Sequence, residues 1–214
     1  MAVVIAGASR GIGLGLAEYY RAEGLDVIGT ARSAGADLKL DVTQPSSNRE
    51  MAQALGERAV ELLVCNAGVF LDRSNDLETE YGPDLWAQSF ATNVTGVFLS
   101  IQALLPHLRR AGSPRIAIIS SQMGSSEIAS GGSYIYRASK AAALNLGRNL
   151  AEDLKPEGIA VGIYHPGWVQ TDMGGATAAI TVEASVDGLV ARFAALSLET
   201  TGCFETWDGR AHPY

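Results

Sequence analysis

The chain has 214 residues, which is enough for one well-buried core and short for two separate domains. Its composition, 47% apolar and 18% charged, fits a compact globular protein and excludes a disordered one. The formal net charge of −7 argues against binding to a nucleic-acid backbone, and no apolar run approaches the roughly 20 residues of a membrane span.

Short runs rich in Val and Ile alternate with longer amphipathic stretches along the chain, which is typical of repeated βαβ units. We predict strands at 2–6, 26–30, 37–40, 60–65, 115–120, 159–164 and 203–206. We predict helices at 12–23, 46–55, 83–110, 134–153 and 182–197. The predicted fold is α/β, with a single doubly wound parallel sheet of about seven strands flanked by helices, in one Rossmann-type domain over residues 1–214.

The first residues predict a strand rather than a signal peptide, because they contain no basic leader and no long apolar region. The two cysteines, Cys65 and Cys203, are far apart and are expected to be buried, reduced thiols. The histidines His107, His165 and His212 are too scattered to predict a metal site. We therefore expect a cytoplasmic protein without a bound metal.

A glycine-rich turn connects the first predicted strand to the first predicted helix. Residues 7–13 read GASRGIG, so three glycines allow a tight turn and a close approach of the backbone to a pyrophosphate. The phosphate charge would then lie on exposed N–H groups at the start of the helix. A strand before the turn and a helix after it are the context that a dinucleotide-binding site requires.

The spacing of this turn, G-x-x-x-G-x-G, resembles that of the short-chain dehydrogenase/reductase family. Further segments resemble the family's motifs in the family's order, and they are DV at 41–42, NAG at 66–68, ATNVTG at 91–96, SS at 120–121, YRASK at 136–140 and PGWVQT at 166–171. The resemblance covers residues 1 to about 172. The short segment 173–181 and the DGR at 208–210 also resemble the C-factor-like subgroup.

The resemblance implies four catalytic residues, Asn93, Ser121, Tyr136 and Lys140. The i, i+4 spacing places Tyr136 and Lys140 on one face of a helix, where the ammonium group favours the phenolate. Tyr136 would then be the general acid in reduction and the general base in oxidation. Ser121, the second residue of its pair, would hydrogen-bond the substrate oxygen, and Asn93 would anchor a water that connects Lys140 to solvent.

The residues around the expected adenosine ribose favour NADP(H) over NAD(H). Ala31 stands where an NAD enzyme of this family carries an acidic residue, and Arg10 and Arg32 are placed to bind a 2′-phosphate. The full set predicted to bind the cofactor is Gly7, Ser9, Arg10, Gly11, Ile12, Gly13, Arg32, Asp41, Val42, Asn66, Ala67, Gly68, Tyr136, Lys140, Pro166, Gly167, Val169 and Thr171.

We therefore predict an NADP(H)-dependent oxidoreductase that transfers a hydride between the cofactor and a small-molecule carbonyl or secondary alcohol. A nucleotide-binding regulatory or signalling protein is the main alternative, and an epimerase or dehydratase is a third. The short segment 173–181 suggests an open pocket with a loose or bulky substrate preference. Candidate pocket residues are Phe70, Gln122, Met123, Tyr134, Trp168 and Met173. The resemblance also implies a homodimer or homotetramer.

Overall fold

One parallel sheet forms the centre of the computed structural model, which describes residues 2–33, 35–78 and 81–214. Within these residues the sheet has seven strands in the order β3-β2-β1-β4-β5-β6-β7. The strands are β1 (Ala2–Ala6), β2 (Asp26–Ala31), β3 (Leu38–Lys39), β4 (Val60–Cys65), β5 (Arg115–Ile119), β6 (Ala160–His165) and β7 (Phe204–Thr206). The predicted fold class is confirmed.

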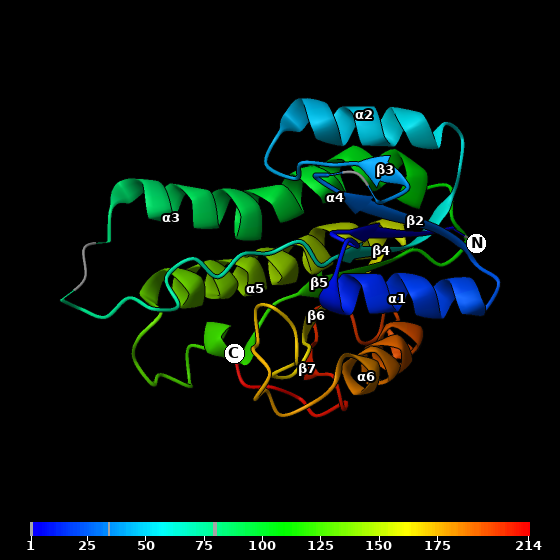
Figure 1. The fold of residues 1–214 in the computed structure, drawn as a ribbon. Coiled ribbons are helices and arrows are strands. Elements are labelled where there is room, and N and C mark those ends of the chain that lie inside the picture. The colour runs from blue at the N-terminus through cyan, green and yellow to red at the C-terminus, as the bar shows by residue number, and fades with distance from the viewer. Residues whose placement is uncertain (1, 34, 79–80) are drawn as a thin grey trace.

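Helices cover both faces of the sheet (Figure 1). Helices α1 (Gly11–Ala22) and α6 (Val182–Ala195) pack on one face, and α2 (Pro45–Leu55), α4 (Gly96–Leu108) and α5 (Tyr134–Leu154) pack on the other. Both faces of the central strand β1 are buried, because Val3 and Ile5 contact one helical layer and Val4 and Ala6 contact the other. This two-sided burial explains why the strand is a continuous apolar run rather than an alternating one.

The predicted helix 83–110 is wrong in one respect, because it is not continuous. It consists of α3 (Pro83–Phe90), a π-helical turn (Ala91–Thr95) and α4, which ends at Leu108. The π turn contains Asn93, whose side-chain amide bonds both backbone groups of Val69 in the neighbouring loop. A π turn contains one more residue than an α turn. This extra residue turns the Asn93 side chain inward and interrupts the regular α-helix. Short 3₁₀ helices at Gln122–Gly124 and Lys155–Glu157 were also not predicted.

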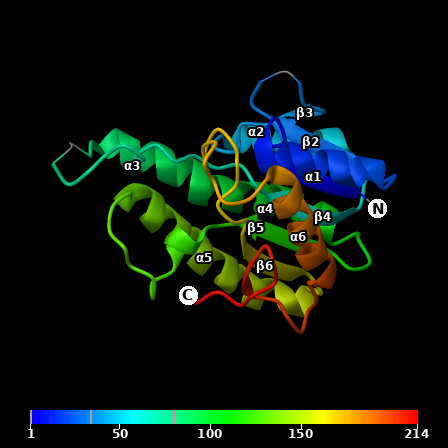
Figure 2. The same cartoon turned by 60° about the horizontal axis from the view of Figure 1, so that its bottom comes forward.

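The order of the strands reverses between β1 and β4, since the chain runs outward to β3 on one side and to β7 on the other. In open parallel sheets a crevice forms at such a reversal, outside the carboxyl ends of the strands. Figure 2 shows that the loop between β6 and α6 rises beside this edge of the sheet, and that α3 and the start of α5 project beyond it. The carboxyl edge is therefore enclosed by loops from several parts of the chain.

Candidate active site

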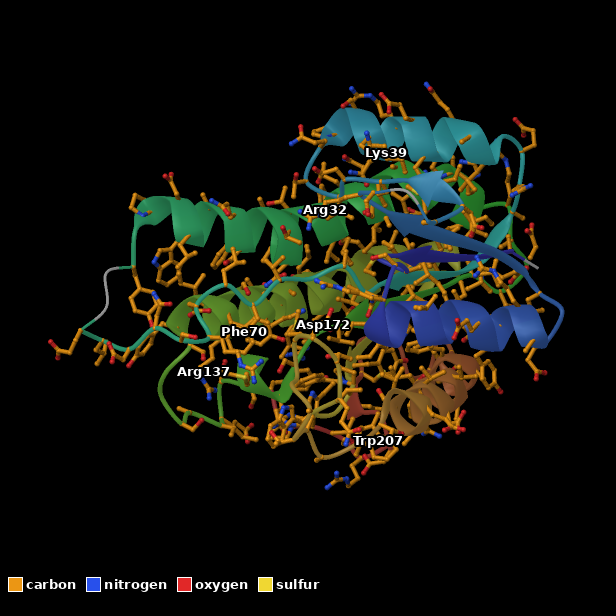
Figure 3. The ribbon with its side chains drawn as sticks, viewed as in Figure 1. Arg32, Lys39, Phe70, Arg137, Asp172 and Trp207 are labelled. Atoms are coloured by element: carbon orange, nitrogen blue, oxygen red, sulfur yellow. The ribbon has the colours of Figure 1, made fainter. Side chains whose placement is uncertain are left out.

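A cavity of about 460 Å³ lies at the carboxyl edge of the sheet. Two of its lining residues are labelled in Figure 3, Arg32 near β2 and Asp172 beside the start of α1. Most of the residues predicted to bind cofactor or substrate line it, namely Gly7, Ser9, Arg10, Gly11, Ile12, Arg32, Asp41, Val42, Asn66, Ala67, Gly68, Tyr136, Lys140, Pro166 and Thr171.

The glycine turn fits a pyrophosphate. Gly7 and Gly11 have φ values of 88° and 54°, in the left-handed region that favours glycine. A Cβ on Gly13 would lie 2.0 Å from the carbonyl oxygen of Gly7, so the third glycine allows the turn to pack on the helix. Arg10, the residue before α1, makes no capping bond with its side chain. The first N–H groups of α1 are thus left without a side-chain acceptor, and such groups bind anions.

Cations gather at the end of the cavity formed by β2. Ala31 ends β2 without a carboxylate, and Arg32 follows it on the cavity wall. Lys39, which the sequence did not single out, pairs with Ala31 across the sheet and is exposed on the same edge (Figure 3). Arg10 also lines the cavity, but its Nη1 atom lies 2.8 Å from the carboxylate of Asp172. The sequence did not predict this ion pair.

Tyr136 and Lys140 lie together at the other end of the cavity, on one face of α5. Both are buried, and the ammonium nitrogen of Lys140 lies 5.7 Å from the centre of the Tyr136 ring. Lys140 donates a hydrogen bond of 2.9 Å to the carbonyl oxygen of Ile119 at the end of β5. Burial lowers the pKa of Lys140 to about 8, so the group still carries its positive charge at pH 7. Burial raises the pKa of Tyr136 to about 12, and a hydrogen bond with Ser121 acts in the opposite direction.

The structure distinguishes the two serines at the end of β5. The side chain of Ser121 lies near enough to the Tyr136 phenol to lower its pKa, and its hydroxyl accepts from the N–H of Met123. The hydroxyl of Ser120 instead donates to the backbone carbonyl of Lys140, at 3.0 Å. Ser121 thus lies near the phenol without lining the cavity, whereas Ser120 lines the cavity and fixes the β5–α5 contact, and the catalytic role of Ser121 stays a prediction.

Asn93 lies under the cavity wall rather than on it. Its Oδ1 atom accepts from the N–H of Val69 at 2.8 Å, and its Nδ2 atom donates to the Val69 carbonyl and to the Ser139 hydroxyl, both at 2.9 Å. Both amide protons are therefore used in tying the π turn to the loop after β4 and to α5. The predicted water relay from Asn93 to Lys140 stays a prediction.

Three further residues of the predicted cofactor set lie behind the cavity wall, and they are Gly13, Gly167 and Val169. A Cβ on Gly167 would meet Ile180 at 2.4 Å, and Val169 is buried in a bridge with Ile180. These positions shape the wall from behind. Conversely, the cavity is also lined by residues outside the predicted set, namely Leu40, Thr43, Val69, Thr92, Ile119, Ser120, Gln170, Asp172 and Val182. Thr92, Ser120 and Gln170 lie within predicted motifs, and most of the others directly precede or follow one.

The predicted substrate pocket is formed differently from the expectation. Phe70 stacks on the ring of Tyr136, with centroids 4.1 Å apart and planes 16° apart. Met173 lines the cavity, whereas Tyr134 packs edge-on against Tyr81 and Trp168 is half exposed. Gln122 and Met123 lie in the 3₁₀ turn after Ser121. Phe70 thus contacts Tyr136 directly, and Met173 is the candidate that lines the cavity.

Two contacts hold the segment after Thr171 against the rest of the site. Arg73, in the loop after β4, donates to the carbonyls of Met173 and Gly174 at 2.6 and 3.3 Å. The indole N–H of Trp168 also donates to the Gly174 carbonyl, at 2.9 Å. The segment 173–181, which we call the lid, is therefore joined to the loop on the opposite side of the cavity.

No cluster of His, Cys, Asp and Glu with the geometry of a metal site occurs among the residues that the structure describes. In the same part of the chain, no helix combines the length and apolar character that a membrane crossing requires.

Comparison with known proteins assigns this arrangement to one family. The sequence profile described as short chain dehydrogenase matches residues 1–180. The chain is 37% identical over 156 residues to the C-signal protein of Myxococcus xanthus, covering 72% of this chain and 93% of that protein. It is 34% identical over 224 residues to the 1-hydroxy-2-glutathionyl-2-methyl-3-butene dehydrogenase of Rhodococcus sp. (strain AD45), covering 97% and 96%.

A solved structure similar to this one is the NADPH-bound carbonyl reductase from chicken fatty liver. It matches with a TM-score of 0.91 and 30% sequence identity, covering all of this chain and 98% of that chain. The match extends through the lid and the last strand, so it includes every element that encloses the cavity.

Proposed function

Because the chain belongs to the short-chain dehydrogenase family, we propose that it is an NADP(H)-dependent oxidoreductase that interconverts a small-molecule carbonyl and its secondary alcohol. The observation that carries the proposal is the set of residues that line the cavity at the carboxyl edge. One end of the cavity holds arginines and an uncapped helix start, and the other end holds Tyr136 and Lys140, with Ser121 beside the phenol.

The residues that would hold the cofactor follow from the lining of the cavity. The glycine turn and the start of α1 would bind the pyrophosphate, and Arg32 with Arg10 would bind the 2′-phosphate. One N–H of the Lys140 ammonium group donates to the Ile119 carbonyl, and the remaining N–H groups would donate to the nicotinamide ribose. When bound, NADPH supplies the hydride.

The chain's own residues would manage the proton. The Ser121 hydroxyl would donate to the substrate carbonyl oxygen and hold it beside the Tyr136 phenol. As negative charge develops on that oxygen, the phenol would give it a proton, and the oxidation direction reverses this transfer. A phenol with a pKa of about 12 is a weak acid, so the positive charge of Lys140 nearby would make the transfer easier by stabilising the phenolate.

The regulatory alternative is supported less well. A protein that only binds nucleotide would need the glycine turn and Lys140, but it has no use for a phenol in the cavity with a serine hydroxyl beside it. We further propose, from the family alone, that the protein works in the cytoplasm as a homodimer or homotetramer.

The test is oxidation of NADPH and NADH by the purified protein with a panel of aldehydes, ketones, diketones and quinones. We expect turnover with NADPH, and a loss of kcat of at least about 100-fold in Tyr136→Phe, since a positioned general acid contributes that much. Tyr19→Phe, which removes a phenol hydroxyl on α1, is the matched control and should keep full activity. Tight binding of NADPH without turnover on any compound would favour the regulatory protein instead.

A further inference from the structure

A buried carboxylate lies next to the general acid and belongs to neither the predicted motifs nor the cavity lining. Asp72, in the loop after β4, has no exposed surface. Its carboxylate accepts from the N–H of Ile135 at 2.8 Å and from the N–H of Tyr136 at 3.2 and 3.4 Å. A residue 63 positions away in sequence thus binds the first turn of the helix that carries Tyr136.

The start of α5 needs this distant acceptor because its own flanking residue does not cap it. Ser133 immediately precedes the helix, yet its φ is 48° and its side chain makes no capping bond. Gly131 and Gly132 before it are also left-handed, and the guanidinium of Arg137 donates to both of their carbonyls. The local chain therefore leaves free N–H groups in the first turn, and Asp72 accepts from two of them.

The same short segment also contacts the side chain of Tyr136. Phe70 stacks on its ring, and Val69 is bonded through both backbone groups to Asn93 in the π turn. Tyr136 is thus held by its backbone N–H and by one face of its ring. A carboxylate at the positive end of a 21-residue helix is also electrostatically favourable.

We propose that Asp72 is a positioning residue for the reaction, which caps α5 from a distance and thereby fixes the Tyr136 phenol at its working position. Proton transfer depends on a placement accurate to a fraction of an ångström, so a loosened first turn should slow the chemical step. Cofactor binding should be spared, because Asp72 lies outside the cavity lining. This inference rests on the proposed function, since it assumes that Tyr136 transfers the proton.

The test compares Asp72→Ala, Asp72→Asn and, as a matched control, Thr201→Val. The hydroxyl of Thr201 accepts from the N–H of Val161, so this control also removes a distant side-chain acceptor of a backbone donor, but at the opposite end of β6 from the site. For each variant we would measure kcat, the Kd of NADPH by fluorescence, and the exchange rates of the Ile135 and Tyr136 amide protons.

In Asp72→Ala we expect kcat to fall by at least about tenfold with the Kd of NADPH within about twofold of wild type, because only the placement of the phenol is disturbed. Both amides should exchange faster. In Asp72→Asn, kcat should stay within about threefold of wild type, because the side-chain oxygen of Asn caps a helix about as well as that of Asp. Thr201→Val should match wild type in all three measurements.

Two results would overturn the inference. The first is an Asp72→Ala protein with faster amide exchange and unchanged kcat, because Asp72 would then only stabilise the helix. The second is an Asp72→Asn protein with protected amides and a kcat as low as that of Asp72→Ala. If the wild-type protein turns over no carbonyl compound, the proposed function fails separately, and amide exchange alone still shows whether Asp72 caps α5.

Discussion

At the scale of single residues, Arg10 occupies a position with two possible partners. It lines the end of the cavity proposed for the 2′-phosphate, but its guanidinium is paired with Asp172 across the cavity mouth. Both side chains are about three-quarters exposed, so the pair contributes at most about 1 kcal/mol. A phosphate group with two negative charges would therefore displace Asp172 at small cost.

Asp172→Asn should consequently tighten NADPH binding by about two- to fivefold. The ion pair between Arg10 and Asp172, which contributes at most about 1 kcal/mol, then no longer competes with the 2′-phosphate for Arg10. The gain for NADH should be smaller, since NADH carries no 2′-phosphate. Fluorescence titration with both cofactors checks this, with Arg10→Ala as the opposite change that weakens NADPH binding. Equal gains for NADPH and NADH would mean that Asp172 acts on the pyrophosphate rather than through Arg10.

The sequence indicated those residues of the site that stand in local motifs. Tyr136, Lys140 and Ser121 were indicated by the resemblance of their segments to the family's motifs, and the i, i+4 spacing accounts for the common helix face of Tyr136 and Lys140. Phe70 and Asp72 were not predictable as partners of Tyr136, because their contacts cross more than 60 positions and depend on the path of an irregular loop. Likewise, no pattern indicates that Ser133 fails to cap α5.

At the scale of elements, the lid is attached to the loop after β4 through Arg73. Its guanidinium bonds the Met173 and Gly174 carbonyls, and Met173 itself lines the cavity. A short lid was expected to leave an open pocket. The Arg73 contact connects the lid to the loop after β4, so we expect access for substrate to depend on this link.

Arg73→Gln should loosen the lid, because a shorter neutral side chain cannot reach both carbonyls. We expect faster proteolysis within 173–181 and a KM for the carbonyl substrate raised by about three- to tenfold, since charge-assisted hydrogen bonds contribute about 1.5 kcal/mol or more. Arg49→Gln, an exposed arginine on α2, is the matched control. Unchanged proteolysis together with an unchanged KM would show that the bonds of the lid to Trp168 and Gln170 hold it without Arg73.

The boundaries of the regular elements were largely predictable, because buried strands and amphipathic helices have clear periods. The interruption of the long helix was not. The π turn accompanies hydrogen bonds between the Asn93 amide and the backbone of Val69. This tertiary contact does not change the spacing of apolar residues along the helix, so the sequence gives no sign of it. Strand β3 is also shorter than predicted, since only Leu38 and Lys39 pair with β2.

At the scale of the whole molecule, a buried histidine makes stability depend on pH. His165 at the end of β6 is 7% exposed, and its Nδ1 atom has no hydrogen-bond partner. Burial, and then the nearby charge of His212, lower the pKa of His165 from 6.5 to about 4. Between these two values the unfolded chain binds a proton that the folded chain does not, so the free energy of unfolding falls as pH decreases from 6.5 to 4.

His165→Leu should flatten this part of the stability curve, because it removes a contribution of at most about 3 kcal/mol across that pH interval. Urea unfolding at several pH values from 4.5 to 7.5 measures it, with the wild-type protein in parallel to account for the carboxylates that titrate in the same range. An unchanged difference between pH 7.5 and pH 4.5 would mean that His165 accepts its proton without unfolding.

The order of the strands has a consequence for how the chain acquires its structure. Strand β1, which precedes the other six strands in the chain, lies between β2 and β4, and none of the parallel pairings can form through a simple hairpin. The last wall of the cavity comes from Val182, far along the chain. Folding should therefore be slow, because it depends on contacts between distant segments. During synthesis, cofactor binding can stabilise the fold only after most of the chain has left the ribosome.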